Sequence, residues 1–345
     1  MDEIKSLIFR TDRIGDFILS APFIQTYKKK NPNCKIVLVS SDYNYNYVKN
    51  FDFIDDVISI KIDNKLYSKI YSSINLFFKL RKHKYKDIII LDGKNRSFFT
   101  SFLLPGQKNV LYKSNLLKNI TKFLNHKVVN NYEIQPQYKN LNFLANLIGF
   151  NVESENINIY EKYNFSSTHN SKKKYILIHL DEKWFTKHYY HDFTDIKPDY
   201  QNLIILIKKI IKNTNNKYSI KITSGFKRLN IINELIQDFN KEMPNRYFKE
   251  IDGIIVEYID KISFFELESI VKNSSFLLCC EGGVSHASHN LKIPTLAFYE
   301  ESRLEHIIHW TGHMDKINLY PRKNLVKIIN DQSFFDIFQK ELIIK

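Results

Sequence analysis

The sequence predicts an α/β protein with parallel sheets, because short apolar runs alternate with helical patterns along most of its 345 residues. Residues 276–280 form an apolar run short enough to be a buried strand, and the glycines in 281–283 predict a turn. Residues 284–291 then have the pattern of a short helix, and 295–299 that of another strand. Strand, turn, helix and strand make one step of a parallel sheet.

The turn at residues 281–283 has the properties of an anion site. The first N–H groups of a helix have no partner inside the helix, and the peptide dipoles add positive potential there. Glycines let a phosphate come close to these groups, and Ser285 and His286 add side-chain donors. The same residues also fit a plain tight turn in which Ser285 caps the helix. The glycine pair alone does not decide between the two interpretations.

Composition predicts a well-packed, reduced protein. Hydrophobic residues make up 43% of the chain, aromatic residues 14%, and there are only 9 Gly and 8 Pro. No apolar run approaches the ~18–20 residues that cross a bilayer, and the chain enters a strand without a signal-peptide pattern. The three cysteines, Cys34, Cys279 and Cys280, lack metal-ligand spacing and are expected to be small core residues. We therefore expect a cytoplasmic protein.

The net charge of +14 is concentrated in the first half. Residues 1–170 carry 25 Lys and Arg against 15 Asp and Glu, whereas residues 171–345 carry 26 against 22. This asymmetry favours an anionic partner for the first half: a phosphorylated glycolipid, a membrane surface or nucleic acid. The chain is rich in Lys throughout, so solvated lysines also account for part of the charge.

Two βα halves are expected. In the first half we predict strands at 4–9, 35–40, 57–60 and 87–91, with helices from Asp16 and over 65–83, and a mostly helical or irregular stretch over 97–150. In the second half we predict strands at 175–179, 218–223, 276–280 and 295–299, and helices near 200–213, 228–239, 262–272 and 322–345.

These elements divide into domains of residues 1–165 and 171–325, with 151–170 as the polar connection. Residues 326–345 form a C-terminal helix that is expected to pack back on the first domain.

Three motifs together resemble the bacterial heptosyltransferases of glycosyltransferase family 9. Residues 14–22, Ile-Gly-Asp-Phe-Ile-Leu-Ser-Ala-Pro, are similar to the family's N-terminal motif. Residues 281–286, Glu-Gly-Gly-Val-Ser-His, with Leu-Lys-Ile-Pro-Thr at 291–295, are similar to its donor-binding motif. Residues 175–183, Tyr-Ile-Leu-Ile-His-Leu-Asp-Glu-Lys, are similar to the strand and loop that supply a lysine to the donor.

The resemblance implies a GT-B fold, in which two Rossmann-like domains with parallel sheets face each other across a cleft. It implies inverting, metal-independent transfer of a sugar, typically heptose from ADP-heptose, to a lipopolysaccharide or lipooligosaccharide core or a related surface glycan. No cofactor is expected besides the nucleotide-sugar donor. The implied partners are the nucleotide sugar and a lipid-linked anionic acceptor, with peripheral contact at the inner face of the inner membrane.

The resemblance also assigns roles to residues. Asp16 matches the catalytic base that takes the acceptor hydroxyl proton; as a plain helix cap it would fit the same position. Donor and phosphate contacts are expected from a set that can stabilise charge on the leaving diphosphate. That set is Lys183, Glu281, Gly282, Gly283, Val284, Ser285 and His286. Arg10 and Arg13 flank the Asp16 turn and are expected either to hold acceptor phosphates or to be plain surface charge.

Two departures from the family pattern concern the donor. Glu281 stands where an aspartate is common, and Lys227 follows the Ser-Gly-Phe turn of 224–226, where an acidic residue often holds the ribose. A lysine cannot accept a hydrogen bond. The alternative hypothesis is therefore a catalytically inactive nucleotide-sugar-binding or assembly protein of the same fold. Nucleic-acid binding is not expected, because the aromatic residues lie within apolar runs and no such motif is present.

Overall fold

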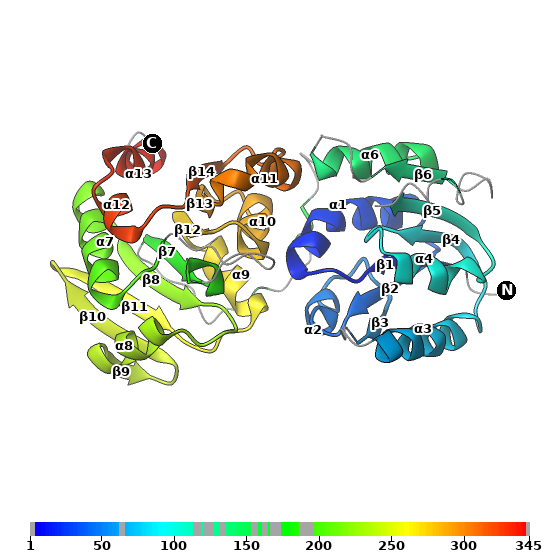
Figure 1. Ribbon diagram of the computed structural model, residues 1–345, viewed down its shortest axis with the longest axis horizontal. Helices are drawn as coiled ribbons and strands as arrows, with labels where there is room; N and C mark the ends of the chain where they lie inside the picture. Colours follow the sequence, from blue (N-terminus) through cyan, green and yellow to red (C-terminus); the bar gives the residue numbers. More distant parts are fainter. Residues whose placement is uncertain are drawn as a thin grey trace. The chain divides into compact units, whose positions relative to one another are not determined.

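The computed structural model describes residues 4–61, 66–112, 119, 127–130, 136–152, 158–160, 165, 174–185 and 196–342. The chain forms two compact units (Figure 1). Unit 1 comprises Met1–Asn164 with Ile308–His313, and unit 2 comprises Phe165–Ile307 with Met314–Lys345. The expected connection over 151–170 lies mostly outside the described residues.

Unit 1 is built on sheet A, whose six strands are all parallel and run in the order β3-β2-β1-β4-β5-β6. The strands are β1 (Lys5–Arg10), β2 (Lys35–Ser41), β3 (Asp56–Ile60), β4 (Tyr85–Ile90), β5 (Gln107–Tyr112) and β6 (Lys127–Asn130). The helices are α1 (Ile14–Lys30), α2 (Tyr45–Val48), α3 (Leu66–Leu80), α4 (Asn95–Phe102) and α6 (Gln137–Ile148). The chain builds outward from β1 to β3 and then returns to β4, so the strand order reverses between β1 and β4.

Helices cover both faces of sheet A, because its strands are apolar on both sides. Figure 1 shows α1 and α6 on one side of the sheet and α3 and α4 on the other. On the α3 side, Leu7 and Phe9 of β1 pack into one cluster with Leu80 of α3 and Phe98 of α4. Strands buried on both faces are typical of a parallel sheet and explain the nearly continuous apolar runs in the sequence.

Unit 2 contains sheet B, in the order β14-β13-β12-β7-β8-β11-β10-β9. Its strands are β7 (Tyr175–Leu180), β8 (Ser219–Ser224), β9 (Asn240–Met243), β10 (Arg246–Ile251), β11 (Ile254–Ile259), β12 (Phe276–Cys280), β13 (Thr295–Tyr299) and β14 (Ile317–Pro321). The helical elements are η2 (Glu182–Trp184), α7 (Tyr200–Asn213), α8 (Asn230–Asp238), α9 (Phe264–Lys272), α10 (Gly283–Asn290), η3 (Glu301–Arg303), α11 (Leu304–Thr311), α12 (Leu325–Ile329) and α13 (Gln332–Leu342). The expected fold class, α/β with two Rossmann-like domains, is confirmed.

Sheet B departs from the expected parallel arrangement at one edge. β10 pairs antiparallel with β11 and with β9, while the other pairs are parallel. The hairpin between β10 and β11 turns at Asp252 and Gly253, whose φ angles are +49° and +79°. Asp-Gly is a strong hairpin signal, because both residues tolerate positive φ. The sequence analysis passed over this signal and placed no strand between residues 240 and 259.

The stretch 97–150, expected to be mostly helical or irregular, holds most of α4 and the whole of α6, and also two short strands that were not predicted, β5 and β6. One further expectation is corrected. The C-terminal helix was expected on the first domain, but Phe338 of α13 packs on Phe276 of β12, with ring centroids 4.7 Å apart, inside the core of unit 2. Its apolar face therefore covers sheet B.

The expected role of the cysteines as core residues is confirmed: all three are free and buried. No helix among the described residues is both long and apolar enough to cross a lipid bilayer.

Candidate active site

Asp16 is the third residue of α1 and both caps the helix and reaches solvent. Its Oδ2 accepts a hydrogen bond from the backbone N–H of Arg13, the N-cap residue, at 3.1 Å. The side chain remains 25% exposed. A carboxylate at this position satisfies a helix N–H and is favoured by the helix dipole. The capping interpretation is thus present in the structure, and it leaves the carboxylate accessible to a small molecule.

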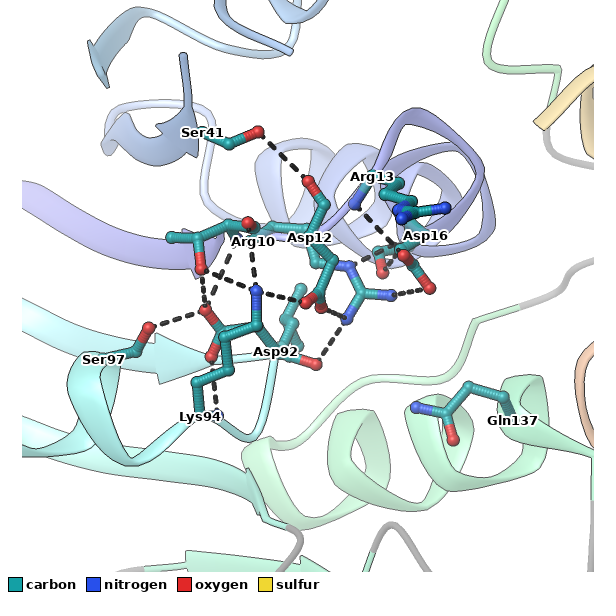
Figure 2. A network of polar contacts seen from close by, with 12 residues as sticks. Arg10, Asp12, Arg13, Asp16, Ser41, Asp92, Lys94, Ser97 and Gln137 are labelled. Carbon is teal, nitrogen blue, oxygen red and sulfur yellow. Dashed lines mark hydrogen bonds and ion pairs between the residues drawn. The ribbon is translucent and has the colours of Figure 1, made fainter. Parts of the chain in front are cut away.

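Arg10, at the end of β1, is buried and has partners inside unit 1. Its Nε donates to the carbonyl oxygen of Asp16 at 2.9 Å, and its Nη1 donates to the carbonyl oxygen of Leu91 at 2.6 Å and to Asp12 Oδ2 at 3.3 Å (Figure 2). The residue is 2% exposed. This burial disfavours the predicted contact of Arg10 with an acceptor. Arg13 is exposed, and its acceptor contact stays a prediction.

A second polar cluster surrounds Asp92, which follows β4 and is fully buried. One oxygen of Asp92 accepts hydrogen bonds from the hydroxyls of Thr11 and Ser97, both at 2.6 Å. The Nζ of Lys94 lies 2.6 Å from Asp12 Oδ1 (Figure 2). These bonds compensate the burial of the charges. The cluster therefore holds the loops after β1 and β4 in one fixed arrangement.

This cluster lies at the reversal of strand order between β1 and β4, where ligands of open α/β sheets bind. The sequence analysis identified Asp16 at this edge but missed Asp12, Asp92 and Lys94. A signal was available, because Leu-Asp-Gly-Lys at 91–94 places polar residues directly after a buried strand. Their proximity required knowing that β1 and β4 are neighbours.

In unit 2 the predicted donor turn forms as expected between β12 and α10, with Gly282 as the N-cap residue and Gly283 and Val284 opening the helix. Ser285 is fully buried. Its Oγ accepts from the N–H of Gly282 at 3.1 Å and donates to the carbonyl oxygen of Gly282 at 2.8 Å. Ser285 therefore holds the turn. His286 is 5% exposed, and phosphate contacts of both side chains stay predictions.

Lys183 is brought onto this turn by η2, which follows β7. Its Nζ donates a hydrogen bond to the carbonyl oxygen of Glu281 and lies 3.8 Å from Glu281 Oε2. A Cβ on Gly282 would lie 2.6 Å from that Nζ, closer than real Cβ contacts allow. Glycine at 282 is thus what lets the ammonium group of Lys183 rest on the turn. Two motifs almost 100 residues apart in sequence meet at one point.

Beside this turn, the pKa values of two neighbouring carboxyl groups, Asp181 and Glu281, are shifted in opposite directions. Burial raises the pKa of Asp181 to about 7, against the opposing charge of Lys183. Burial also acts to raise the pKa of Glu281, but the charges of Lys183, His286, His306 and Arg322 prevail and lower it. Glu281 is therefore an anion at neutral pH, whereas Asp181 titrates near neutrality. The sequence analysis quoted Asp181 within its motif but assigned it no role.

A carboxylate lies near the turn after β8, although that turn itself carries Lys227 and no acidic residue. A Cβ on Gly225 would lie 3.3 Å from Glu182 Oε2 and 3.2 Å from the Cβ of Asp181. Glu182 comes from η2 and so reaches this turn from a different strand end. A carboxylate oxygen here can accept a hydrogen bond, which Lys227 cannot do.

A cavity of about 530 Å³ opens near the carboxyl end of β14. It is lined by Lys197, Arg322, Lys323, Asn324, Lys327 and Asp331. Nε and Nη1 of Arg322 are buried and have no hydrogen-bond partner among the described residues. Buried guanidinium nitrogens without partners are costly, and an anion in the cavity would satisfy them.

Within the described ranges, no three or more His, Cys, Asp or Glu side chains are grouped so that they could hold a metal ion.

The fold and the two polar sites define a two-domain α/β protein with an acidic site at the switch point of one sheet and a glycine turn, contacted by a lysine, at a helix N-terminus beside the other. No protein-family model matches the sequence. The chain is 24% identical over 310 residues to lipopolysaccharide heptosyltransferase 1 of Campylobacter coli, an alignment that covers 86% of this chain and 84% of that protein.

Solved structures show the same architecture. The heptosyltransferase WaaC of E. coli, solved with ADP-2-deoxy-2-fluoro heptose, superposes with a TM-score of 0.71 at 14% identity, covering 98% of this chain and 99% of that one. A glycosyl transferase family 9 protein of Veillonella parvula superposes with a TM-score of 0.66 at 12% identity, covering 100% and 98%. The resemblance to heptosyltransferases that the motifs indicated is confirmed, and the fold is shared.

One further match concerns only a small part of a large protein. The chain is 24% identical over 263 residues to reticulocyte-binding protein homolog 1 of Plasmodium falciparum, covering 68% of this chain. It spans 8% of that protein's length, so the match says nothing about a shared activity.

Proposed function

We propose that this chain is an inverting glycosyltransferase that moves a sugar from a nucleotide-activated donor, ADP-heptose, to a lipopolysaccharide core or related surface-glycan acceptor. The similarity to the Campylobacter coli heptosyltransferase over nearly the whole of both chains supports the reaction class. The ADP-heptose analogue in the E. coli structure supports the donor.

The donor diphosphate would bind on unit 2. The N-terminus of α10 offers backbone N–H groups and positive potential, and Lys183 adds a cation directly on the same turn. Arg322 supplies further hydrogen-bond donors that have no partner among the described residues. It lies close enough to the turn for its charge to help lower the pKa of Glu281. Glu182 would accept a hydrogen bond from the ribose. This set stabilises the negative charge that grows on the departing diphosphate, without a metal ion.

Asp16 of unit 1 would act as the base. The acceptor hydroxyl oxygen attacks the anomeric carbon, its proton passes to Asp16, and the bond from that carbon to the diphosphate oxygen breaks with its electron pair leaving on the nucleotide. Attack opposite to the leaving group inverts the anomeric centre. Arg10, buried in unit 1, donates a hydrogen bond to the main-chain carbonyl oxygen of Asp16, and the carboxylate of Asp16 stays partly exposed.

The observation that carries this proposal is the contact of Lys183 with the 281–283 turn, because it brings a cation to a helix N-terminus, and both attract a phosphate. Calorimetry with ADP, UDP and GDP tests the site and its base preference. A transfer assay with ADP-heptose and a truncated core acceptor tests the reaction. Absence of ADP binding would overturn the assignment.

The second candidate is a nucleotide-sugar-binding or assembly protein without turnover. Lys227, exposed at the turn where a ribose contact is expected, favours it. Tight ADP-heptose binding with no transfer to any core acceptor, and no hydrolysis of the donor, would select this candidate over the enzyme.

A further inference from the structure

Unit 1 carries an apolar surface on the outside of α3 and α4, which pack against each other on one side of sheet A (Figure 1). The surface consists of large side chains that are at least 39% exposed. They are Tyr67 (88%), Ile70 (49%), Tyr71 (72%), Ile74 (51%) and Phe78 (51%) on α3, and Phe99 (60%), Phe102 (39%) and Leu103 (72%) at α4. We call these eight residues the apolar patch. Among the residues that the structure describes, 19 large hydrophobic side chains are exposed, so nearly half of them gather here.

The spacing within α3 places its five patch residues on one stripe. At 100° per residue, positions 67, 70, 71, 74 and 78 fall within about 100° of the helix circumference. Leu76 and Leu80 point the opposite way and are buried in the core of unit 1. The helix is thus apolar on both faces, and the outer stripe exceeds what scattered surface residues explain.

The chain around the patch is strongly basic. Residues 66–86 contain six Lys and Arg and no Asp or Glu, and residues 93–104 contain Lys94 and Arg96 and no acid. Lys79, Arg81, Lys82 and Lys84 at the end of α3 are all exposed. The guanidinium carbon of Arg81 lies 5.1 Å from the ring centroid of Phe78, which places a cation at the edge of the stripe.

We propose that the apolar patch and this basic rim dock unit 1 on an anionic lipid bilayer. A helix lying in the membrane interface needs an apolar stripe for the acyl boundary and cations for the headgroups, and both are present here. Tyrosine is suited to the interface, because its ring is apolar and its hydroxyl is polar. A two-fold dimer through this face would bring two basic rims together and is disfavoured by their repulsion. Nucleic acid would leave the apolar stripe unused.

The inference deepens the proposed function, since it would carry the enzyme to lipid-linked acceptors, but it stands on the surface of unit 1 alone. Sedimentation of the full chain with large unilamellar vesicles tests it. We expect binding to vesicles of phosphatidylcholine with phosphatidylglycerol, little binding to phosphatidylcholine alone, and loss of binding at high salt.

Two patch variants and two controls make the test specific. Tyr67→Ser with Tyr71→Ser removes the most exposed part of the stripe, and Lys82→Glu with Lys84→Glu reverses two rim charges. Each pair should weaken vesicle binding by about tenfold or more, because it removes either buried apolar area or attraction to the anionic headgroups. Met243→Ser and the pair Lys217→Glu with Lys241→Glu alter exposed residues of unit 2 and should bind as the original chain does.

The inference is overturned if patch and control variants bind vesicles equally. It is also overturned if ultracentrifugation shows a dimer that the tyrosine variants abolish, or if oligonucleotides bind more tightly than vesicles and the lysine variants abolish that binding. Calorimetry of ADP on the same variants separates the two proposals. Vesicle binding without any ADP binding would contradict only the proposed transferase activity. ADP binding without vesicle binding would contradict only the proposed docking surface.

Discussion

Nε of Arg10 donates a hydrogen bond to the main-chain carbonyl oxygen of Asp16 at 2.9 Å, and Nη2 of the same guanidinium lies 3.7 Å from Asp16 Oδ1. A buried cation thus holds both the backbone and the side chain of the proposed base. The fork shape of the guanidinium matters, because Nη1 simultaneously bonds the carbonyl oxygen of Leu91 after β4. Arg10 ties the loops after two neighbouring strands to the start of α1.

Replacing Arg10 by lysine keeps the charge and removes the fork. We expect kcat for sugar transfer to fall by up to about 100-fold, because a small displacement of a catalytic group has an effect of that size. The KM for donor should stay unchanged. Steady-state kinetics with varied donor measures the split, and Arg81→Lys, at an exposed position directly after α3 in the same unit, is the matched control. Equal kcat values in both variants would show that Arg10 does not position Asp16.

The variant Asp16→Asn tests the role of Asp16 as a base independently of its role in capping α1. The amide oxygen of Asp16→Asn can still accept the N–H of Arg13, so the cap is kept, and thermal stability should fall only by the cost of losing the ion pair with Arg10. Transfer should fall by about 100-fold or more, because an amide cannot take the acceptor proton. ADP binding measured by calorimetry should remain as in the original chain. Full transfer activity in Asp16→Asn would rule out its role as the base.

A methyl group on residue 282 displaces Lys183. Gly282→Ala puts a Cβ 2.6 Å from the present position of the Nζ, so the ammonium, at the end of a flexible side chain, must shift away from Gly282. We expect the Kd for ADP to rise by about tenfold, equivalent to 1.4 kcal/mol. In the background of Lys183→Met the same alanine should cost much less, because the group it displaces is gone. Additive effects in this double-mutant cycle would contradict the proposed contact.

Stability should depend on pH through Asp181. Its pKa is raised to about 7 in the folded chain, from an ordinary value of 3.8, so the folded state holds a proton that the unfolded state has released. The stabilisation is fully present below pH 3.8 and is lost as the pH rises through 7. Asp181→Asn removes this loss, so its free energy of unfolding relative to the original chain should increase between pH 5.5 and 8, by on the order of 2 kcal/mol.

The titration of His179 changes stability with pH in the opposite direction to that of Asp181. The contribution of Asp181 is therefore measured as the difference between the original chain and Asp181→Asn. Burial and the charge of Lys183 lower the pKa of His179 to about 4, so its contribution is lost as the pH falls from 6.5 through 4. Subtracting the two urea-unfolding curves at each pH cancels this term. A difference that does not grow with pH would show that Asp181 is ionised throughout.

Arg322 should contribute to ADP binding through its two unsatisfied nitrogens. Arg322→Gln should raise the Kd for ADP by about tenfold or more, as expected for a charge-assisted hydrogen bond of about 1.5–3 kcal/mol. The effect should shrink in high salt less than that of an exposed lysine, because the guanidinium is partly buried. Lys212→Gln, an exposed change in the same unit, is the control for lost charge. Equal affinities in the two variants would exclude Arg322 from the site.

Periodicity predicted the central strands well, because β7, β12 and β13 are mainly apolar and β1 contains the apolar run 7–9. β9 and β14 were not predicted, because edge strands are at most partly buried and carry polar residues such as Asn240 and Asn318. The hairpin at Asp252 carried a readable turn signal that was not used.

The candidate site divides in the same way. Asp16 and the 281–286 turn were visible because their residues lie next to each other in sequence. The partnership of Lys183 with Gly282, and of Asp12 with Lys94, depends on which strands become neighbours. Arg322 follows an edge strand that was itself missed, so no local pattern pointed to it.

The segment Ile308–His313 belongs to unit 1 although it follows almost the whole of unit 2. His309 Nε2 and Gln137 Oε1 lie 3.1 Å apart within unit 1, across 172 positions of sequence. During synthesis, unit 1 therefore lacks its last segment while about 140 more residues are added, which takes roughly 7–30 s at about 5–20 residues per second. A nascent chain arrested before His309 would hold an N-terminal unit that is still open to proteases at α6.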